Sequence, residues 1–341
     1  MKKVIWFSLL HGLNDCIAGF LLGGLLNFGI EHSKIVFYVL FYNVLSFLGQ
    51  PLVALLLNTI KSPKSVLVIT LLSLILGVFL FQNHTFIGVI LIGVSSSIVH
   101  VVGGVESYGS RQRASDIGIF AAPGVFGLAV GGVMAYAKTD ASLVLVSLSI
   151  LLGVAYFVLN RNEEKKLDLK IAKLVDFEDH DLIMLLLLGV ISLRSIVWNV
   201  FQTIHTHDYW TLLYFGMAAM LGKLFGGALS DRFGAKKFAY FSILSSIPFL
   251  TFWKGNLCSS LFGVFLLQSS FPATTLLLLH RLQNKIDLGI AYSFGISVVL
   301  GGLLYFSPLQ FYLMKSSGLF VLLLLTFAML LYYDYKSQKT L

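Results

Sequence analysis

Charged residues, cysteine and proline are all scarce in this sequence. Asp, Glu, Lys and Arg together account for 12% of the 341 residues, whereas a soluble globular domain has roughly 25%. The two cysteines, Cys16 and Cys258, both lie in apolar runs, which argues against a disulfide framework or a cysteine-based metal site. No glycine-rich phosphate loop occurs, so the chain by itself has no means of using a nucleotide as an energy source.

Long apolar runs fill most of the chain. Hydrophobic residues make up 57% of it, and a helix that crosses a bilayer needs about 20 such residues in succession. The sequence therefore predicts an all-α polytopic membrane protein with twelve transmembrane helices around a central cavity. The expected spans are near residues 4–27, 35–57, 65–81, 85–108, 115–137, 141–159, 182–203, 209–229, 237–254, 257–279, 288–313 and 316–334.

The longest predicted loop, 161–181, is strongly charged. We interpret it as a cytoplasmic linker between an N-terminal six-helix half, 1–160, and a C-terminal six-helix half, 182–341. The basic start and apolar run at the N-terminus are similar to a secretory signal peptide. Asp15 interrupts that run and no small-residue cleavage site follows, so we expect a retained first helix.

Basic residues exceed acidic ones and give a formal net charge of +8. They are scattered over short loops, which argues against a nucleic-acid partner and indicates membrane topology instead. If both termini are cytoplasmic, the only lysines and arginines in the outside loops are Lys34, Lys138, Lys254 and Lys315. We therefore predict a multi-pass protein of the cell membrane, the inner one where there are two, with lipid as its surroundings. We expect it to be a monomer.

One loop sequence occurs twice, at corresponding places in the two predicted halves. Residues 49–64 read GQPLVALLLNTIKSPK, and residues 222–237 read GKLFGGALSDRFGAKK. In this alignment Gly49 matches Gly222, Asn58 matches Asp231, and Lys64 matches Lys237. A loop repeated at half the chain length predicts a duplicated helix bundle, which is the plan of many secondary transporters.

The second copy resembles the loop between helices two and three of the major facilitator superfamily, as it recurs between helices eight and nine. The resemblance implies a conformational latch in which Gly227 allows close helix approach. Asp231 would cap a neighbouring helix or hold Arg232 and Lys236. In the first copy Asn58 stands in place of the acid.

Further segments resemble the fosmidomycin-resistance branch of that superfamily. They read HGLNDCIAGFLLGGL in helix one, SSIVHVVGGVESYGSRQRASDIGIF in helix four, LRS in helix seven and the glycine-rich restart of helix eleven. By resemblance, the branch positions are occupied by His11, Asp15, His100, Arg194 and Gly289. Helix five also contains a proline and glycines that resemble the superfamily's antiporter motif: Pro123, Gly124, Gly127 and Gly131. A generic tight helix contact is the alternative for that motif.

Ionisable residues inside the predicted spans are the candidate site. A charge at the bilayer centre costs at least about 2.5 kcal/mol, so those that are present usually serve a function. His11, Asp15, His100 and Arg194 lie deep, and Glu106 lies near the cytoplasmic end of helix four. Gln268 adds a hydrogen-bonding group in helix ten. In a bundle like that of the superfamily, helices one, four, seven and ten line the cavity. We expect Lys223 to reach the membrane interface or join the latch.

His11 and Asp15 are four residues apart and therefore share one helix face. We hypothesise that Asp15 approaches Arg194 across the two halves, and that protonation of Asp15 releases Arg194 for an anionic or polar substrate. His11 would tune the proton affinity of Asp15. A static buried ion pair is the alternative, and for His100 the alternative is a satisfied interior histidine.

These residues predict a proton-coupled secondary transporter that exports a small amphipathic compound, with no cofactor and the proton gradient as its energy source. Uptake by symport, a membrane-embedded enzyme using His11 and Asp15, and a transport-dead sensor of the same fold are the alternatives. We expect no enzyme activity. The segment from His205 to Asp208 could bind a metal, but a short polar turn is the favoured interpretation, so no metal site is expected.

Overall fold

The computed structural model describes the chain except for residues 58–62, 162–179, 205–207, 283–284, 306 and 340–341. The described residues form helices joined by short turns and contain no strand. The α-helices are α1 Lys2–Gly23, α2 His32–Asn43, α3 Gln50–Leu57, α4 Pro63–Phe81, α5 Thr85–Tyr108, α6 Ala114–Tyr136, α7 Ala141–Arg161, α8 His180–Ile204, α9 Tyr209–Phe233, α10 Ala235–Thr251, α11 Leu257–Arg281, α12 Ile286–Ala291, α13 Ser297–Tyr305, α14 Gln310–Leu313 and α15 Ser316–Lys339. Two π-helical segments, η1 Val44–Leu48 and η2 Tyr292–Ile296, join α2 to α3 and α12 to α13.

Within the described residues, nine helical segments are long and apolar enough to cross a membrane. This confirms a polytopic all-helical architecture. The number of twelve spans and the division at 161–181 stay predictions, because most of that linker lies outside the described residues. One boundary is wrong: the expected span 288–313 ends at Tyr305, and the short α14 follows separately. Pro308 lies between them, and proline lacks the N–H that a continuous helix would need there.

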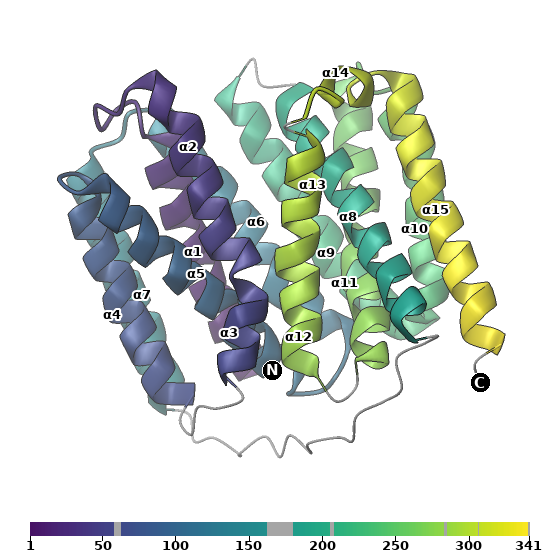
Figure 1. Ribbon diagram of the computed structural model, residues 1–341, viewed down its shortest axis with the longest axis horizontal. Helices are drawn as coiled ribbons and strands as arrows, with labels where there is room; N and C mark the ends of the chain where they lie inside the picture. Colours follow the sequence, from purple (N-terminus) through teal and green to yellow (C-terminus); the bar gives the residue numbers. More distant parts are fainter. Residues whose placement is uncertain (58–62, 162–179, 205–207, 283–284, 306, 340–341) are drawn as a thin grey trace.

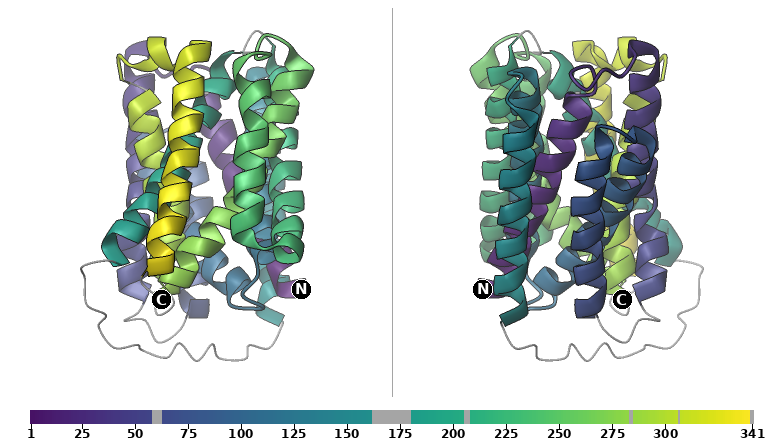
Figure 2. Two further views of the ribbon diagram at one scale, coloured as in Figure 1. Left: turned by 90° about the vertical axis from the view of Figure 1, so that its right-hand side faces the viewer. Right: turned by 90° about the vertical axis from the view of Figure 1, so that its left-hand side faces the viewer.

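The helices stand roughly upright beside one another, and both chain ends lie at the same end of the bundle (Figures 1 and 2). In Figure 1, α1–α5 and α7 lie on one side and α8–α15 on the other. The two groups meet where α6 packs against α9 and where the α2–α3 rod meets the α12–α13 rod. A Cβ atom on Gly295 of η2 would overlap with the backbone oxygen of Phe47 in η1, so the two π-helical segments touch at this junction.

Helices α1 and α6 pack closely along their length. A Cβ atom on Gly131 would overlap with the carbonyl oxygen of Cys16, and one on Gly127 would overlap with that of Gly12. The glycines of the predicted helix-five motif therefore allow the two backbones to touch. This contact fixes α1, which carries His11 and Asp15, against α6.

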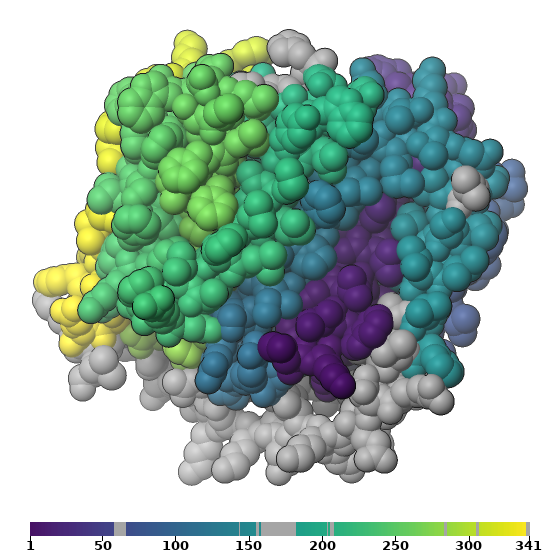
Figure 3. Space-filling model, turned by 180° about the vertical axis from the view of Figure 1, so that it is seen from behind, coloured from purple at the N-terminus to yellow at the C-terminus, as the bar shows by residue number. Residues whose placement is uncertain are grey.

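The outer surface of the bundle is apolar. Figure 3 shows α1 in purple reaching the surface on one face. Two residues of α1, Ile5 and Leu9, are each 44% exposed. Phe241 and Ile69 are exposed elsewhere, at 60% and 68%. Lipid tails are as apolar as these side chains, so such a surface suits a bilayer.

Candidate functional site

Three ionisable side chains from α1 and α5 meet in the interior of the bundle. The Nε2 atom of His11 lies 3.1 Å from the Nε2 atom of His100 and 3.2 Å from Oδ2 of Asp15. The Nε2 atom of His100 lies 3.7 Å from Oδ1 of Asp15. Both imidazoles are buried, whereas the Asp15 side chain keeps 15% of its surface exposed. We call these three residues the histidine–aspartate cluster.

Backbone carbonyls fix the orientation of both imidazoles. His11 Nδ1 lies 2.9 Å from the carbonyl oxygen of Phe120, and His100 Nδ1 lies 2.7 Å from that of Ser96. A carbonyl oxygen only accepts, so each Nδ1 carries the donated proton. In the neutral rings both Nε2 atoms are then lone-pair acceptors. Two acceptor nitrogens and a carboxylate thus face one another, and only a positive centre makes that arrangement favourable.

Polar neighbours and a glycine hold Asp15 in place. Asn14 donates from Nδ2 to Oδ1 of Asp15 at 2.9 Å and to the hydroxyl of Ser96 at 2.9 Å. A Cβ atom on Gly124 would lie 2.8 Å from Oδ2 of Asp15 and would overlap with the His11 ring. Gly124 of α6 therefore leaves the space that the cluster occupies.

A second charged group comes from α8, α9 and α11. Arg194 is 5% exposed and donates from Nη1 to Oε1 of Gln268 at 2.6 Å. Its guanidinium carbon lies 4.7 Å from the centre of the Phe271 ring, and Nζ of Lys223 lies 4.9 Å from the same ring. Lys223 also donates to the carbonyl oxygen of Ala121 at 3.4 Å. The buried Nε of Arg194 has no hydrogen-bond partner among the described residues. We call Arg194, Lys223 and Gln268 the cationic cluster.

An aromatic group connects the two clusters. The Phe120 ring stacks on His11 with centroids 4.5 Å apart, and it lies 5.5 Å from Phe294. Phe294 lies 5.1 Å from Phe271, which carries both cations on its ring. Phe294 belongs to η2, and π-helical turns inside α-helices often occur at functional sites. The site therefore joins a carboxylate on one side to two cations on the other through apolar rings.

Asp231 joins the two groups of helices at the end that carries the termini. Its Oδ1 accepts from the backbone N–H of Ala114 at 2.9 Å, and its Oδ2 accepts from that of Ser115 at 3.3 Å. These are first-turn N–H groups of α6, which have no partner within the helix. A negative charge at a helix N-terminus is also stabilised by the helix dipole. Gly227 allows this approach, because a Cβ atom there would lie 2.8 Å from the oxygen of Ala114.

The other predicted latch residues have partners elsewhere. Lys236 forms an ion pair with Asp334 at 2.6 Å, and the Arg232 guanidinium lies 5.4 Å from the Phe233 ring. Asn58 lies outside the described residues. Close to Asp231, the loop residue Arg111 pairs with Asp116 of α6, and this hydrogen bond raises the pKa of Arg111. In this structure Asp231 therefore caps helix α6 and does not pair with Arg232 or Lys236.

Replacing Asp231 with alanine should loosen this end of the protein. Loss of a helix cap costs about 1 kcal/mol, which corresponds to roughly a fivefold change in a population ratio. Maleimide labelling of Ser230→Cys, in a Cys16→Ser, Cys258→Ser background, should therefore accelerate about fivefold. Asp334→Ala is the matched control, since it removes an acid whose partner, Lys236, lies in the same group of helices. Equal labelling rates in the two variants would contradict a latch role for Asp231.

Comparison with known proteins identifies the fold of this chain through solved structures of low sequence identity. No protein family model matches the chain, and no curated protein matches it. Among solved structures, the E. coli fucose:proton symporter matches with a TM-score of 0.72 and 11% identity over 98% of each chain. A structure of a major facilitator transporter in the outward conformation matches with a TM-score of 0.75 and 11% identity, covering 98% of this chain and 97% of that one. The chain has the major facilitator fold.

A bacterial homologue of the iron transporter ferroportin, in an outward-facing state, is also similar. It has a TM-score of 0.63 and 14% identity over 99% of this chain and 98% of that one. The superfamily resemblance seen in the repeated loop is therefore confirmed at the level of the fold. The narrower resemblance to the fosmidomycin-resistance branch stays a prediction.

The structure groups the predicted site residues differently from the hypothesis. His100 joins His11 and Asp15, and Arg194 joins Gln268. Asp15 and Arg194 have separate partners in this conformation, so their approach stays a prediction for another state. Glu106 pairs with Lys3 near the N-terminus and away from both clusters.

Some site residues were missed or misplaced by sequence reasoning. The interpretation of Lys223 as an interfacial or latch residue is wrong, because its ammonium group faces Phe271 inside the bundle. Phe271 and Phe294 were missed among the 29 phenylalanines. The one available signal for Lys223 was its place as a lone cation in an apolar helix.

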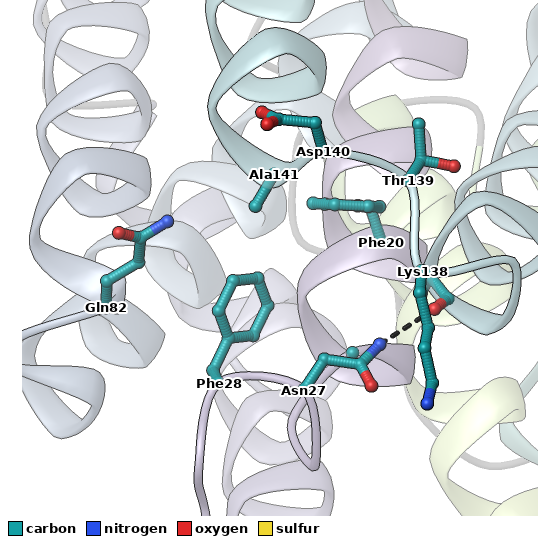
Figure 4. A pocket seen from close by; sticks show the side chains of 10 residues that line it. Phe20, Asn27, Phe28, Gln82, Lys138, Thr139, Asp140 and Ala141 are labelled. Atoms are coloured by element: carbon teal, nitrogen blue, oxygen red, sulfur yellow. Dashed lines mark hydrogen bonds between the residues drawn. The ribbon is translucent and has the colours of Figure 1, made fainter.

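A separate pocket lies near the end of α1 that is farthest from the N-terminus (Figure 4). Its volume is about 680 Å³, and its lining includes Phe20, Phe28, Gln82, Lys138 and Asp140. Asn27 closes one side by donating to the carbonyl oxygen of Ala135 at 2.8 Å. The pocket contains no residue of either charged cluster and is therefore not the candidate site.

Proposed function

We propose that this protein is a proton-coupled secondary transporter that works by alternating access and exports a small molecule. One observation carries the proposal: a partly buried carboxylate beside two buried histidines lies across an aromatic group from two cations, the buried Arg194 and the partly buried Lys223. Buried ionisable groups in membrane proteins mark substrate and proton pathways because they are costly to retain. A transporter, rather than an enzyme, is the function that this site and this fold favour.

The histidine–aspartate cluster is the proposed proton site. Its two Nε2 atoms and the Asp15 carboxylate need one positive centre, and a proton shared among them supplies it. Loss of that proton leaves three acceptors facing one another, which favours rearrangement of α1 against α5. The exposed fraction of Asp15 gives the proton a way in and out. The proton gradient then supplies the energy, and no cofactor is needed.

The cationic cluster is the proposed substrate site. Arg194 and Lys223 both lie against the Phe271 ring, and neither forms an ion pair with an acidic residue in the described part of the chain. Two interior cations, one buried and one partly buried, favour an anionic group on the substrate when they have no counter-ion. Phe120, Phe271 and Phe294 offer an apolar surface beside it. We therefore propose a small amphipathic anion as the substrate.

Movement between two states is supported by the contacts between the two groups of helices. Asp231 holds the N-terminus of α6 at one end, and the two π-helical segments touch where α2–α3 meets α12–α13. We propose that this conformation is outward-facing, with both termini in the cytoplasm of a cell membrane and with the chain acting as a monomer. The two helical groups, 1–160 and 182–341, would rock about the site.

Export is proposed because the glycines of α6 resemble the antiporter motif. Uptake by proton symport is the second candidate, and the fold similarity to a fucose:proton symporter favours it. A transport-dead sensor with the same fold is the third.

Purified protein in liposomes with a trapped pH indicator tests these candidates. We expect some small amphipathic anions to drive proton movement opposite to their own flux. Movement in the same direction would favour symport, and no movement across a broad panel would favour the sensor.

A further inference from the structure

We infer that the histidine–aspartate cluster is also a binding site for one divalent first-row transition-metal ion of the Zn²⁺ type. The inference goes beyond proton-coupled transport, since it concerns equilibrium binding and holds whether or not the protein transports. It rests on the geometry of His11, Asp15 and His100, whose possible ligand atoms all lie within 4.8 Å of one another.

The spacing of the three groups matches a tetrahedral site. Zn²⁺ lies about 2.0–2.1 Å from imidazole nitrogen and carboxylate oxygen, and a regular tetrahedron with those bonds separates its ligand atoms by about 3.3 Å. The two Nε2 atoms are 3.1 Å apart. Each also lies near one oxygen of the Asp15 carboxylate, His11 at 3.2 Å from Oδ2 and His100 at 3.7 Å from Oδ1. Small side-chain movements would therefore place one ion at equal distance from all three ligands.

The surroundings of the two imidazoles are those of metal ligands. A histidine that binds a metal through Nε2 usually donates its Nδ1–H to a carbonyl or carboxylate, which fixes the tautomer. His11 does so to Phe120 and His100 does so to Ser96. Asn14 similarly holds Asp15 by donating to its Oδ1. The ligands are thus already oriented before any ion binds.

The ligand types select the kind of ion. Two imidazoles and one carboxylate suit Zn²⁺, Fe²⁺, Co²⁺ or Cu²⁺, whereas Mg²⁺ and Ca²⁺ prefer sites made of oxygen. Three protein ligands leave the fourth position open, as in zinc sites that bind a water molecule or another ligand. The exposed part of Asp15 provides access to that position. The sequence-based expectation of no metal site is replaced by this proposal.

Titration of metal-free full-length protein in detergent micelles with Co²⁺ tests the inference. We expect one Co²⁺ per chain, with the visible absorption of a tetrahedral complex, and displacement by Zn²⁺. His11→Gln and His100→Gln should each weaken binding at least about 10–100-fold, as expected when a metal site loses part of its support. His100→Cys keeps a ligand and should add a thiolate-to-cobalt charge-transfer band, which a merely structural role of His100 would not produce.

Three controls keep the result specific. His32→Gln and His280→Gln remove exposed histidines and should leave binding unchanged. The double variant His205→Gln, His207→Gln removes the other histidine pair seen in the sequence. Binding lost in that double variant but retained in His100→Gln would overturn the inference, as would wild-type protein that binds no Co²⁺. Neither result would affect proton-coupled transport, which is measured separately.

Discussion

Replacing Arg194 with glutamine should reduce transport of an anionic substrate by about 100-fold, or roughly 2.7 kcal/mol. Arg194 is a buried cation whose guanidinium binds Gln268 and lies over the Phe271 ring. It has no acidic partner among the residues that the structure describes, so its charge remains for the substrate. Loss of one partner from a buried charged pair typically costs about 2–5 kcal/mol. Substrate flux in liposomes, measured at several concentrations, gives the loss.

Two further variants separate a binding role from a folding role. Arg194→Lys keeps the charge but loses the planar fork that binds carboxylate or phosphate through two hydrogen bonds, and it should recover part of the flux. Arg281→Gln removes an arginine near the end of α11, over the Tyr333 ring, and should transport normally. Full activity of Arg194→Gln would exclude the cationic cluster as the substrate site.

Replacing Gly131 with alanine should strongly destabilise the protein. The added Cβ atom would overlap with the carbonyl oxygen of Cys16, and a backbone atom cannot move aside as a flexible side chain can. Overpacking of this kind costs about 1–3 kcal/mol or more, and here it also separates α1 from α6. We expect a lower melting temperature in detergent and less monodisperse protein in size-exclusion chromatography.

Gly153→Ala is the matched control for that change. Gly153 also lies within an apolar helix, α7, but no atom beyond its chain neighbours and the adjacent helix backbone lies within 4 Å of the position where its Cβ would be. Alanine also has a higher helix propensity than glycine, so this variant should be as stable as the wild type. Equal melting temperatures for the two variants would show that the α1–α6 contact is looser than described.

Features that depend on local sequence were predictable. Apolar runs gave the helices, and the spacing of His11 and Asp15 placed both on one face because an α-helix repeats every 3.6 residues. The repeated loop indicated the superfamily fold, and the position of Asp231 at a helix end suggested a cap. Each of these follows from residues that are close together in the chain.

Features that depend on how helices rotate and cross were not predictable. His100 joins Asp15 only because α5 turns that face towards α1, and Gly124 leaves the room. Lys223 and Phe271 meet across α9 and α11, nearly fifty positions apart in the chain. The π-helical turn that presents Phe294 has no signal in a sequence of apolar residues. The sequence predicts a single charged site, whereas the structure contains the histidine–aspartate cluster and the cationic cluster, joined by aromatic rings.

Proton movement in liposomes containing wild-type protein or Asp15→Asn tests the central claim most directly. A substrate identified from the panel should drive proton flux in the wild type. In Asp15→Asn, which keeps the shape of the side chain but removes its charge, that flux should vanish, while substrate binding at Arg194 persists. Equal proton flux in both proteins would contradict the assignment of Asp15 as the coupling residue and would leave it a structural one.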